Sequence, residues 1–274
     1  MDSIKQAIEL ARAAEAAPAG GVSEPSAVIA GVPPNRFGSP PGKEVRLSPE
    51  HLEANRIVAF GGTAEHGRYY DMLRTQVLQE MDKKSWQFLA VTSPTAGCGK
   101  TVTACNLAIS IARLPERSVL LVDLDLRKPS VAKYLGLGDV GATGILDVLE
   151  GRERASTAVV KARVGPNSIL VLPGSSVTVG SSEWMASQTM GTVLQTIRRE
   201  FRSHIVIFDL PPLLLGDDVL SILPRMDSTL LVAGIGTTSV ADIRECQKFL
   251  QRTPVVRVVA NKVTDKVESY YGYY

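Results

Sequence analysis

Runs of apolar residues alternate with amphipathic stretches along the chain from about residue 51 onwards. Val, Ile and Leu dominate the apolar runs, which predict strands at residues 87–93, 118–126, 168–174, 204–211, 228–235 and 254–261. Apolar positions at helical spacing predict helices at residues 101–114, 182–201 and 239–252. Because the strand runs lack polar alternation, we expect strands that are buried on both faces. The order of elements predicts an α/β fold with a doubly wound, mostly parallel sheet, whose ligand lies at the carboxyl ends of the strands.

The two ends of the chain differ from this pattern. Apolar residues at helical spacing predict an N-terminal helix within residues 1–17, for which docking on its own domain or fraying is favoured over a membrane or partner helix. Residues 18–50 are rich in Pro and Gly and predict a flexible linker. We therefore expect the folded domain at residues 51–262 and a flexible, tyrosine-rich tail at residues 263–274.

Composition narrows the classes of partner. The chain has 274 residues, of which 45% are apolar, and its net charge is +2. Because this net charge is small, we do not expect a partner that is bound through overall charge, such as nucleic acid. Cys98, Cys105 and Cys246 are scattered and odd in number, which argues against a disulfide framework and a zinc site and fits a reducing cytoplasm. No apolar run approaches the roughly 20 residues that span a bilayer, and the start is unlike a secretory signal. Attachment to a membrane would therefore need another chain.

The stretch "SPTAGCGKT" at residues 93–101 joins the first predicted strand to its helix. It ends in the GK[ST] core of a phosphate loop, although Pro94 stands where GxxxxGK[ST] has its first glycine. We expect Lys100 to reach the terminal phosphates of a nucleotide, and the Thr101 hydroxyl to bind Mg²⁺. The alternative is a glycine-rich turn with a surface lysine. The candidate nucleotide-binding residues of this stretch are Ala96, Gly97, Cys98, Gly99, Lys100, Thr101 and Val102.

Carboxylates follow two other predicted strands. Asp123 and Asp125 stand two apart, with Arg127 after them, and Asp209 ends a further apolar run. Residues i and i+2 of a strand share a face. A carboxylate at the end of a buried strand needs a partner, which Mg²⁺ and phosphate would supply. Alternatively, each Asp is a turn residue or a helix cap.

The sequence leaves the roles of four further residues open. Asp217 or Asp218 is expected to cap a helix, in preference to a role beside the metal. Asn261, at the end of the last strand, either contacts the nucleotide base or is only a turn residue. Cys98 is expected to be a small spacer in the loop, the alternative being an exposed thiol beside Lys100 that oxidises.

Together these motifs resemble the bacterial tyrosine kinases (BY-kinases) of polysaccharide export systems, in the subgroup made as a separate soluble chain. The resemblance covers roughly residues 65–274 and rests on "SPTAGCGKT", "LLVDLDLRKP" and "IVIFDLPP", of which "DLDLRKP" is the most specific. Related partitioning and division-site ATPases carry an additional lysine where this chain has Thr95, which favours the kinase branch. The start "MDSIKQAIELARA" is also similar to that of the soluble subgroup.

The resemblance implies a Walker-type ATPase fold and an ATP- and Mg²⁺-dependent protein-tyrosine kinase. It implies a metal site at Thr101, Asp123 and Asp209, with Asp123 as the base toward the tyrosine hydroxyl. The catalytic residues that it implies are Lys100, Asp123, Asp125, Arg127 and Asp209. Its C-terminal "ESYYGYY" looks like the tyrosine cluster that the family autophosphorylates, which here is Tyr270, Tyr271, Tyr273 and Tyr274.

Partners are implied by the same resemblance. Family members pair with a membrane polysaccharide co-polymerase, whose cytoplasmic tail activates the kinase at the inner face of the membrane, and a phosphotyrosine phosphatase would reverse the reaction. Active members form rings through an ExxRxxR motif. Here Glu65 and Arg68 fit that motif, but Asp71 stands where the last arginine belongs; a shifted alignment keeps Arg74 instead and loses the other two.

The length of the predicted tail determines which active sites its tyrosines could reach. Fully extended, residues 263–274 would span about 40 Å, so phosphorylation of a neighbouring subunit in trans is expected more than phosphorylation in cis.

The alternative function is a nucleotide-gated scaffold that docks on the membrane partner without phosphorylating tyrosine. The departure at Asp71 keeps this alternative open.

Overall fold

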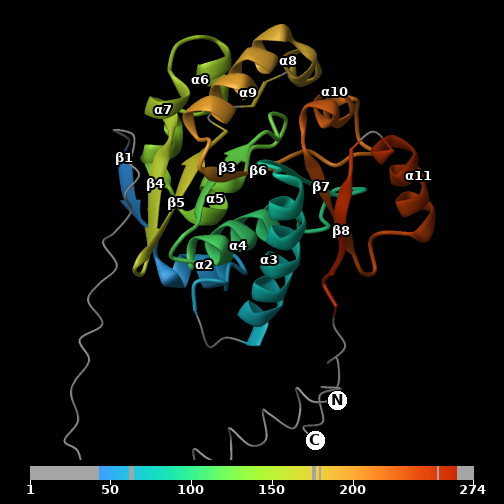
Figure 1. The fold of residues 1–274 in the computed structure, drawn as a ribbon, viewed down its shortest axis with the longest axis horizontal. Helices are drawn as coiled ribbons and strands as arrows, with labels where there is room; N and C mark the ends of the chain where they lie inside the picture. The colour runs from blue at the N-terminus through green and yellow to red at the C-terminus, as the bar shows by residue number, and fades with distance from the viewer. Residues whose placement is uncertain (1–42, 62–64, 175–176, 179, 252, 264–274) are drawn as a thin grey trace, which may run out of the picture. The chain divides into compact units, whose positions relative to one another are not determined.

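A mostly parallel sheet lies at the centre of the computed structural model (Figure 1). The structure describes residues 43–61, 65–174, 177–178, 180–251 and 253–263. Within these residues, strands pair in the order β1-β4-β5-β3-β6-β2-β7-β8. Neighbours are parallel except β4 and β5, which are antiparallel. The strands are β1 (Lys43–Arg46), β2 (Phe88–Thr92), β3 (Ser118–Asp123), β4 (Val160–Val164), β5 (Asn167–Leu172), β6 (His204–Asp209), β7 (Ser228–Gly234) and β8 (Val255–Asn261).

Helices pack on both faces of this sheet, and two separate clusters of buried apolar residues form its two cores. The larger helices are α3 (Glu65–Lys84), α4 (Lys100–Ala112), α9 (Gln188–Glu200) and α11 (Val240–Leu250). The shorter ones are α2 (Pro49–Ala54), α5 (Val131–Leu135), α6 (Ile145–Leu149), α7 (Ala155–Ala158), α8 (Ser181–Ala186) and α10 (Asp218–Ile222), with 3₁₀ turns η1 (Gly138–Ala142) and η2 (Leu223–Arg225).

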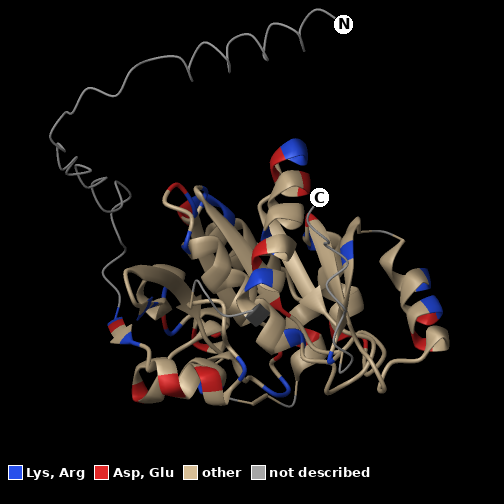
Figure 2. Ribbon diagram, turned by 90° about the horizontal axis from the view of Figure 1, so that it is seen from below, with Lys and Arg blue, Asp and Glu red and all other residues tan. Residues whose placement is uncertain are grey.

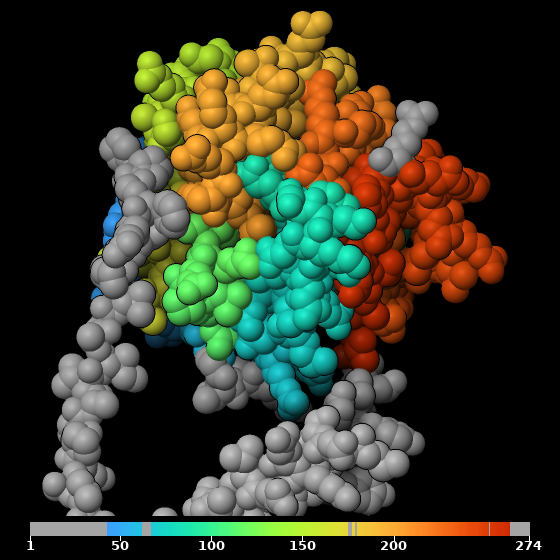
Figure 3. Space-filling view, viewed as in Figure 1, coloured from blue at the N-terminus to red at the C-terminus, as the bar shows by residue number. Residues whose placement is uncertain are grey.

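The division of the helices between the two cores confirms the predicted doubly wound fold. Residues of α2, α3, α4 and α5 join one cluster, and residues of α6 to α11 join the other. α3 forms the front of the domain in the space-filling view, with α8 and α9 above it (Figure 3). Lys and Arg are interspersed with Asp and Glu over the ribbon (Figure 2), in keeping with the small net charge. Among the described residues, no helix combines the length and apolar composition needed to cross a bilayer.

The strand predictions are correct for the centre of the sheet and incomplete at its edges. The strands β2, β6 and β7 are buried on both faces for almost their whole length, as predicted. β8 is a sheet edge, and its exposed and covered residues alternate, so the expectation of two buried faces is wrong there. β4 was not predicted because its alternating "VKARV" is short and polar at two positions.

The predicted linker at residues 18–50 extends too far. Lys43–Arg46 form β1, which pairs with β4, and Leu47 continues the pairing through a 2.8 Å hydrogen bond from its backbone N–H to the Arg163 carbonyl. The part of the chain that the structure describes therefore begins with a strand of the sheet, well before residue 51. Residues 43–47 contain only two apolar side chains, Val45 and Leu47. Two apolar positions are too few to give a recognisable strand pattern in the sequence.

The predicted helix at residues 182–201 is two helices. Ser187 has extended backbone angles between α8 and α9, and its hydroxyl accepts a 3.0 Å hydrogen bond from the Met190 N–H, which caps α9. The helix predicted within residues 1–17 and the tyrosines of the tail lie outside the described residues, so both stay predictions.

Replacing Leu47 tests the corrected boundary of the domain. Leu47 is 3% exposed, so Leu47→Ala should lower the free energy of unfolding by about 2–5 kcal/mol, measured by urea denaturation. The matched control is Glu44→Ala in the same edge segment, which removes only an exposed ion pair with Arg163 and should cost less than about 1 kcal/mol. If both variants left the free energy of unfolding nearly unchanged, residues 43–47 would belong to the linker and not to the folded domain.

Candidate nucleotide site

Residues 93–99 form the turn between β2 and α4, as the sequence predicts. Gly97 and Gly99 have φ angles of 77° and 94°, a left-handed conformation that glycine adopts without strain. Gly99 is the N-cap of α4, no side chain caps the helix, and its first turn carries no acidic residue. The first N–H groups of a helix lack partners within the helix. The start of α4 is therefore suited to bind an anion such as phosphate.

Lys100 lies between two carboxylates, one from the loop after β3 and one from the end of β6. Its ammonium nitrogen is 2.9 Å from Asp125 Oδ2 and 3.3 Å from Asp209 Oδ1. The Thr101 hydroxyl donates a 2.6 Å hydrogen bond to Asp209 Oδ2. It also lies 3.3 Å from Ser130 Oγ, a residue that the sequence did not single out. The predicted residues from the phosphate loop, from the end of β3 and from the end of β6 thus meet at one edge of the sheet.

The charges of this cluster are almost fully removed from solvent. The side chains of Lys100, Asp125 and Asp209 are 12%, 7% and 0% exposed. Burial alone would lower the pKa of Lys100, but the charges of Asp209 and Asp125 outweigh it and raise that pKa. Burial also raises the pKa of Asp209, against the opposing effects of Lys100 and Thr101. One ammonium group is thus shared by several buried carboxyl groups, an arrangement in which further positive charge would be stabilising.

Asp123 is buried beside this cluster and does not face solvent. One carboxylate oxygen accepts N–H groups of Ser130 and Val131 at 2.8 and 2.9 Å, and the other accepts the Asp125 N–H at 3.2 Å. Burial and the Asp209 charge raise the pKa of Asp123 to about 7. Both oxygens therefore hold the loop after β3. The predicted roles of Asp123 as proton acceptor and metal ligand stay predictions.

Arg127, predicted as a catalytic residue, is separate from the Lys100 cluster. Its guanidinium Nε is 2.7 Å from Asp218 Oδ2 and donates a 2.9 Å hydrogen bond to the Ser181 hydroxyl. Ser181 in turn donates to the other Asp218 oxygen at 2.9 Å. Arg127 thus ties the loop after β3 to the starts of α8 and α10. Asp217 occupies the N-cap position of α10, but its side chain makes no capping hydrogen bond.

The remaining predicted residues lie in or against the phosphate loop. Ala96 is exposed and Val102 half-buried. Asn261 donates a 2.9 Å hydrogen bond from its side-chain nitrogen to the Cys98 carbonyl. The Cys98 thiol is 1% exposed, donates to the Thr95 carbonyl at 3.2 Å and lies 3.3 Å from the Thr238 hydroxyl, so the exposed-thiol alternative is wrong. Burial opposes ionisation of this thiol, but its hydrogen bonds, that with Thr238 first, lower its pKa overall.

The donor set fits a magnesium ion that is bound together with phosphate. No group of three or more His, Cys, Asp or Glu side chains within the described part of the chain forms a complete metal site. Mg²⁺ usually takes only one or two protein carboxylates and fills its shell with water and substrate phosphates. The Thr101 hydroxyl and Asp209 carboxylate, in contact at the start of α4, meet that requirement.

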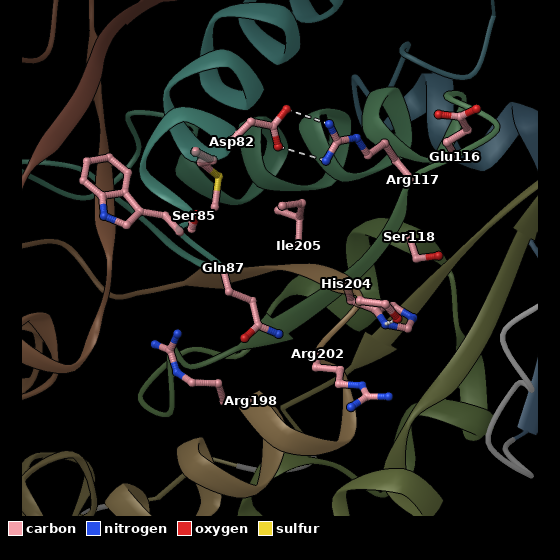
Figure 4. A pocket seen from close by; sticks show the side chains of 13 residues that line it. Asp82, Ser85, Gln87, Glu116, Arg117, Ser118, Arg198, Arg202, His204 and Ile205 are labelled. Atoms are coloured by element: carbon pink, nitrogen blue, oxygen red, sulfur yellow. Dashed lines mark hydrogen bonds and ion pairs between the residues drawn. The ribbon is translucent and has the colours of Figure 1, made fainter.

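A hollow lies at the opposite ends of the strands, where β2, β3 and β6 begin (Figure 4). Its volume is about 430 Å³. Two of the three arginines that line it are already paired within the chain: Arg117 binds Asp82 at 2.6 and 3.0 Å, and Arg198 binds Asp227 at 3.0 and 3.1 Å. The carboxyl edge of the sheet, not this hollow, therefore carries the candidate site.

Comparison with known families agrees with this geometry. Residues 89–271, more than half of the chain, match the family described as the CobQ/CobB/MinD/ParA nucleotide binding domain. The chain belongs to this nucleotide-binding family. The match includes the phosphate-loop glycines, both carboxylate strand ends and Asn261.

Two bacterial relatives match this chain over very different shares of their own length. EpsB of Ralstonia nicotianae is 32% identical over 202 residues, which are 73% of this chain but only 26% of EpsB. The tyrosine-protein kinase CpsD of Streptococcus pneumoniae is 29% identical over 204 residues, 74% of this chain and 86% of CpsD. The chain thus spans about a quarter of the longer relative and most of the shorter one.

A solved structure confirms the fold. The kinase domain of the Escherichia coli tyrosine kinase ETK superposes with a TM-score of 0.64 at 21% identity, over 82% of this chain and 99% of that domain.

The buried carboxyl of Asp123 predicts a pH dependence of stability. Its pKa rises from an ordinary value of 3.8 to about 7 in the folded chain, so the folded state binds the extra proton. The stabilising contribution is complete below about pH 4 and is lost as pH rises through about 7. Asp123→Asn cannot lose a proton there. The melting temperature of the variant minus that of the wild type, measured without nucleotide, should therefore increase from pH 5 to pH 8; a constant difference would contradict the assignment.

Arg127 and Asp218 should be energetically coupled. A double-mutant cycle with Arg127→Ala and Asp218→Asn should give an interaction energy of about 0.5–3 kcal/mol in urea unfolding, because Asp218 is only 3% exposed. A parallel cycle on the exposed pair Lys248 and Glu245 should give an interaction energy near zero. Additive effects of Arg127→Ala and Asp218→Asn would show that the contact does not stabilise the fold.

Proposed function

We propose that this chain is an ATP- and Mg²⁺-dependent protein-tyrosine kinase that regulates the polymerisation and export of an exopolysaccharide or capsule. The convergence of Lys100, Thr101, Asp125 and Asp209 at the uncapped start of α4 carries the proposal. The names of the relatives support the choice of reaction, since CpsD is named a tyrosine-protein kinase. Family membership alone supports only nucleotide binding.

In this proposal each residue has a role that its position supports. The loop amides and the start of α4 bind the triphosphate. Lys100 exchanges its carboxylate partners for phosphate oxygens, while Thr101 and Asp209 hold Mg²⁺, which supplies charge neutralisation when bound. Asp125, freed from Lys100, is the carboxylate nearest to solvent in the cluster and is positioned to accept the proton of a tyrosine hydroxyl. Asp123, the base that the resemblance implied, accepts three backbone N–H groups of the surrounding loop, and its role as base stays a prediction.

The tail supplies the tyrosine in this proposal. β8 ends at Asn261, directly beside the phosphate loop, so the tail starts at the candidate site. A tail of residues 263–274, at most about 40 Å long when extended, is long enough to reach a neighbouring subunit's site, whereas its own site is crowded by the fold from which the tail starts. Tyr270, Tyr271, Tyr273 and Tyr274 are the proposed acceptors, phosphorylated in trans.

The proposed partner is the cytoplasmic tail of a membrane polysaccharide co-polymerase, which would hold the chain at the inner face of the membrane. The two lengths of relatives support this arrangement, since the matched region is a quarter of EpsB but most of CpsD. A separate chain would then supply what the longer relative carries itself. A homo-oligomer and an opposing phosphotyrosine phosphatase complete the proposal.

One observation favours the scaffold alternative. Asp71, at the position of the last arginine of the ring motif, accepts hydrogen bonds from the Ser110 hydroxyl at 2.6 Å and from Arg113 at 2.9 Å. Arg74, kept by the shifted alignment, is 3.1 Å from the same carboxylate. These groups tie α3 to α4 within the chain. A chain that forms no ring would bind nucleotide and its partner without phosphorylating a neighbour.

Labelled ATP separates the two functions. Wild-type protein with γ-labelled ATP and Mg²⁺ should gain label on the tail tyrosines, and Lys100→Met should lower the rate by at least about 100-fold. In a mixture of full-length Lys100→Met with active protein whose four tail tyrosines are changed to phenylalanine, label on the Lys100→Met chain demonstrates transfer in trans. If the protein bound ATP but formed no phosphotyrosine, even with the partner's cytoplasmic tail added, the result would contradict the kinase function and support the scaffold function.

A further inference from the structure

Asn261 contacts the phosphate loop itself, a position that neither sequence-based alternative anticipated. Its side-chain nitrogen donates a 2.9 Å hydrogen bond to the Cys98 carbonyl. Only the NH₂ end of the amide can donate to a carbonyl, so this contact also fixes the orientation of the amide group. The bonded carbonyl belongs to the peptide group that joins Cys98 to Gly99. Gly99 is the N-cap of α4 and directly precedes the first residue of the helix.

The contact needs the glycine that the motif supplies. Gly99 has a φ angle of 94°, and a Cβ at this position would collide with the Asn261 amide nitrogen. Glycine at this point therefore serves two purposes, a left-handed turn and close approach of a side chain from β8. Gly234 at the end of β7 is similar, because a Cβ there would collide with the Thr237 hydroxyl and lie only 3.2 Å from the Cys98 Cα.

Other bonds hold Asn261 and Cys98 in place. The Asn261 carbonyl accepts a 2.9 Å hydrogen bond from the Ile235 N–H, which joins β8 to the turn after β7. In that turn the Thr238 hydroxyl accepts the Gly234 N–H at 2.9 Å and lies 3.3 Å from the Cys98 thiol. The loop is thus attached to the last two strands at both the backbone and the side chain of Cys98.

We propose that Asn261 is a positioning residue that fixes the phosphate loop through the Cys98 carbonyl and so presents its amides to the phosphates. In this role Asn261 acts on the triphosphate part of the ligand through the loop, and its effect does not depend on the base. The predicted effect of Asn261 on the affinity for the triphosphate rests on the proposed nucleotide binding. The rigidity of the loop is a property of the chain alone.

Two ligands distinguish positioning from base contact. Titration calorimetry with Mg·ATP and with Mg·tripolyphosphate, which has no base, is carried out on the full chain and on Asn261→Ala. Loss of one hydrogen bond that holds the loop should weaken both ligands by the same factor, about 3- to 10-fold. Asn55→Ala is the matched control, since its side-chain nitrogen also donates to a backbone carbonyl, that of His51 at 2.8 Å, outside the site. It should leave both affinities unchanged.

Hydrogen exchange tests the loop without any ligand. Amides of residues 95–100 should exchange about 3- to 10-fold faster in Asn261→Ala than in wild type or Asn55→Ala. Asn261→Leu, which keeps the branched shape of the side chain but has no N–H donor, should behave like the alanine variant, and thermal unfolding verifies that both variants fold.

The outcomes separate this inference from the proposed function. Weaker binding of ATP alone with unchanged exchange would assign Asn261 to the base and overturn the inference. Unchanged affinity and unchanged exchange would overturn it as well. A wild-type chain that binds neither ligand would overturn the proposed function, while faster exchange in Asn261→Ala would still support positioning of the loop.

Discussion

A buried ammonium group between two buried carboxylates determines the arrangement of this site. Lys100 reaches Asp125, in the loop just after β3, and Asp209, the last residue of β6, and its ionic contacts draw the phosphate loop, the loop after β3 and the end of β6 together. Burying such charges is costly unless each has a partner, and breaking one contact leaves the other charge uncompensated. Magnesium and triphosphate would bring charge of both signs to this point. The same cluster therefore holds the loops together and is suited to exchange its partners for a ligand.

The centre of the fold could be predicted because its strands carry an unmistakable signal. The largely apolar runs at β2, β6 and β7 reflect burial on both faces, and the parallel order brings their carboxyl ends to one edge. The edges could not be predicted in the same way. β1 and β4 are short, alternate with polar residues and depend on pairing with each other, which a local pattern does not reveal. Ser187 divides a predicted helix through a cap that resembles an ordinary helical serine in the sequence.

The candidate site shows the same division between local motif and distant contact. Spacing within the loop and at the strand ends was enough to predict Lys100, Thr101 and the aspartates. It was not enough to predict which partner each residue takes. Arg127 follows the motif but binds Asp218, more than ninety residues further along the chain, and Asn261 binds the loop instead of standing apart from it. Ser130 was missed because a lone serine after "RKP" carries no signal until the loop folds back on Thr101.

The most direct test is a crystal structure with Mg·ADP, read at the Lys100 ammonium nitrogen. The account predicts phosphate oxygens at the start of α4, Mg²⁺ beside Thr101 and Asp209, and Lys100 moved from its 2.9 Å contact with Asp125 to a phosphate. A nucleotide bound elsewhere, or one bound with the Lys100 contacts to both carboxylates unchanged, would contradict the convergence of these three segments on one nucleotide site.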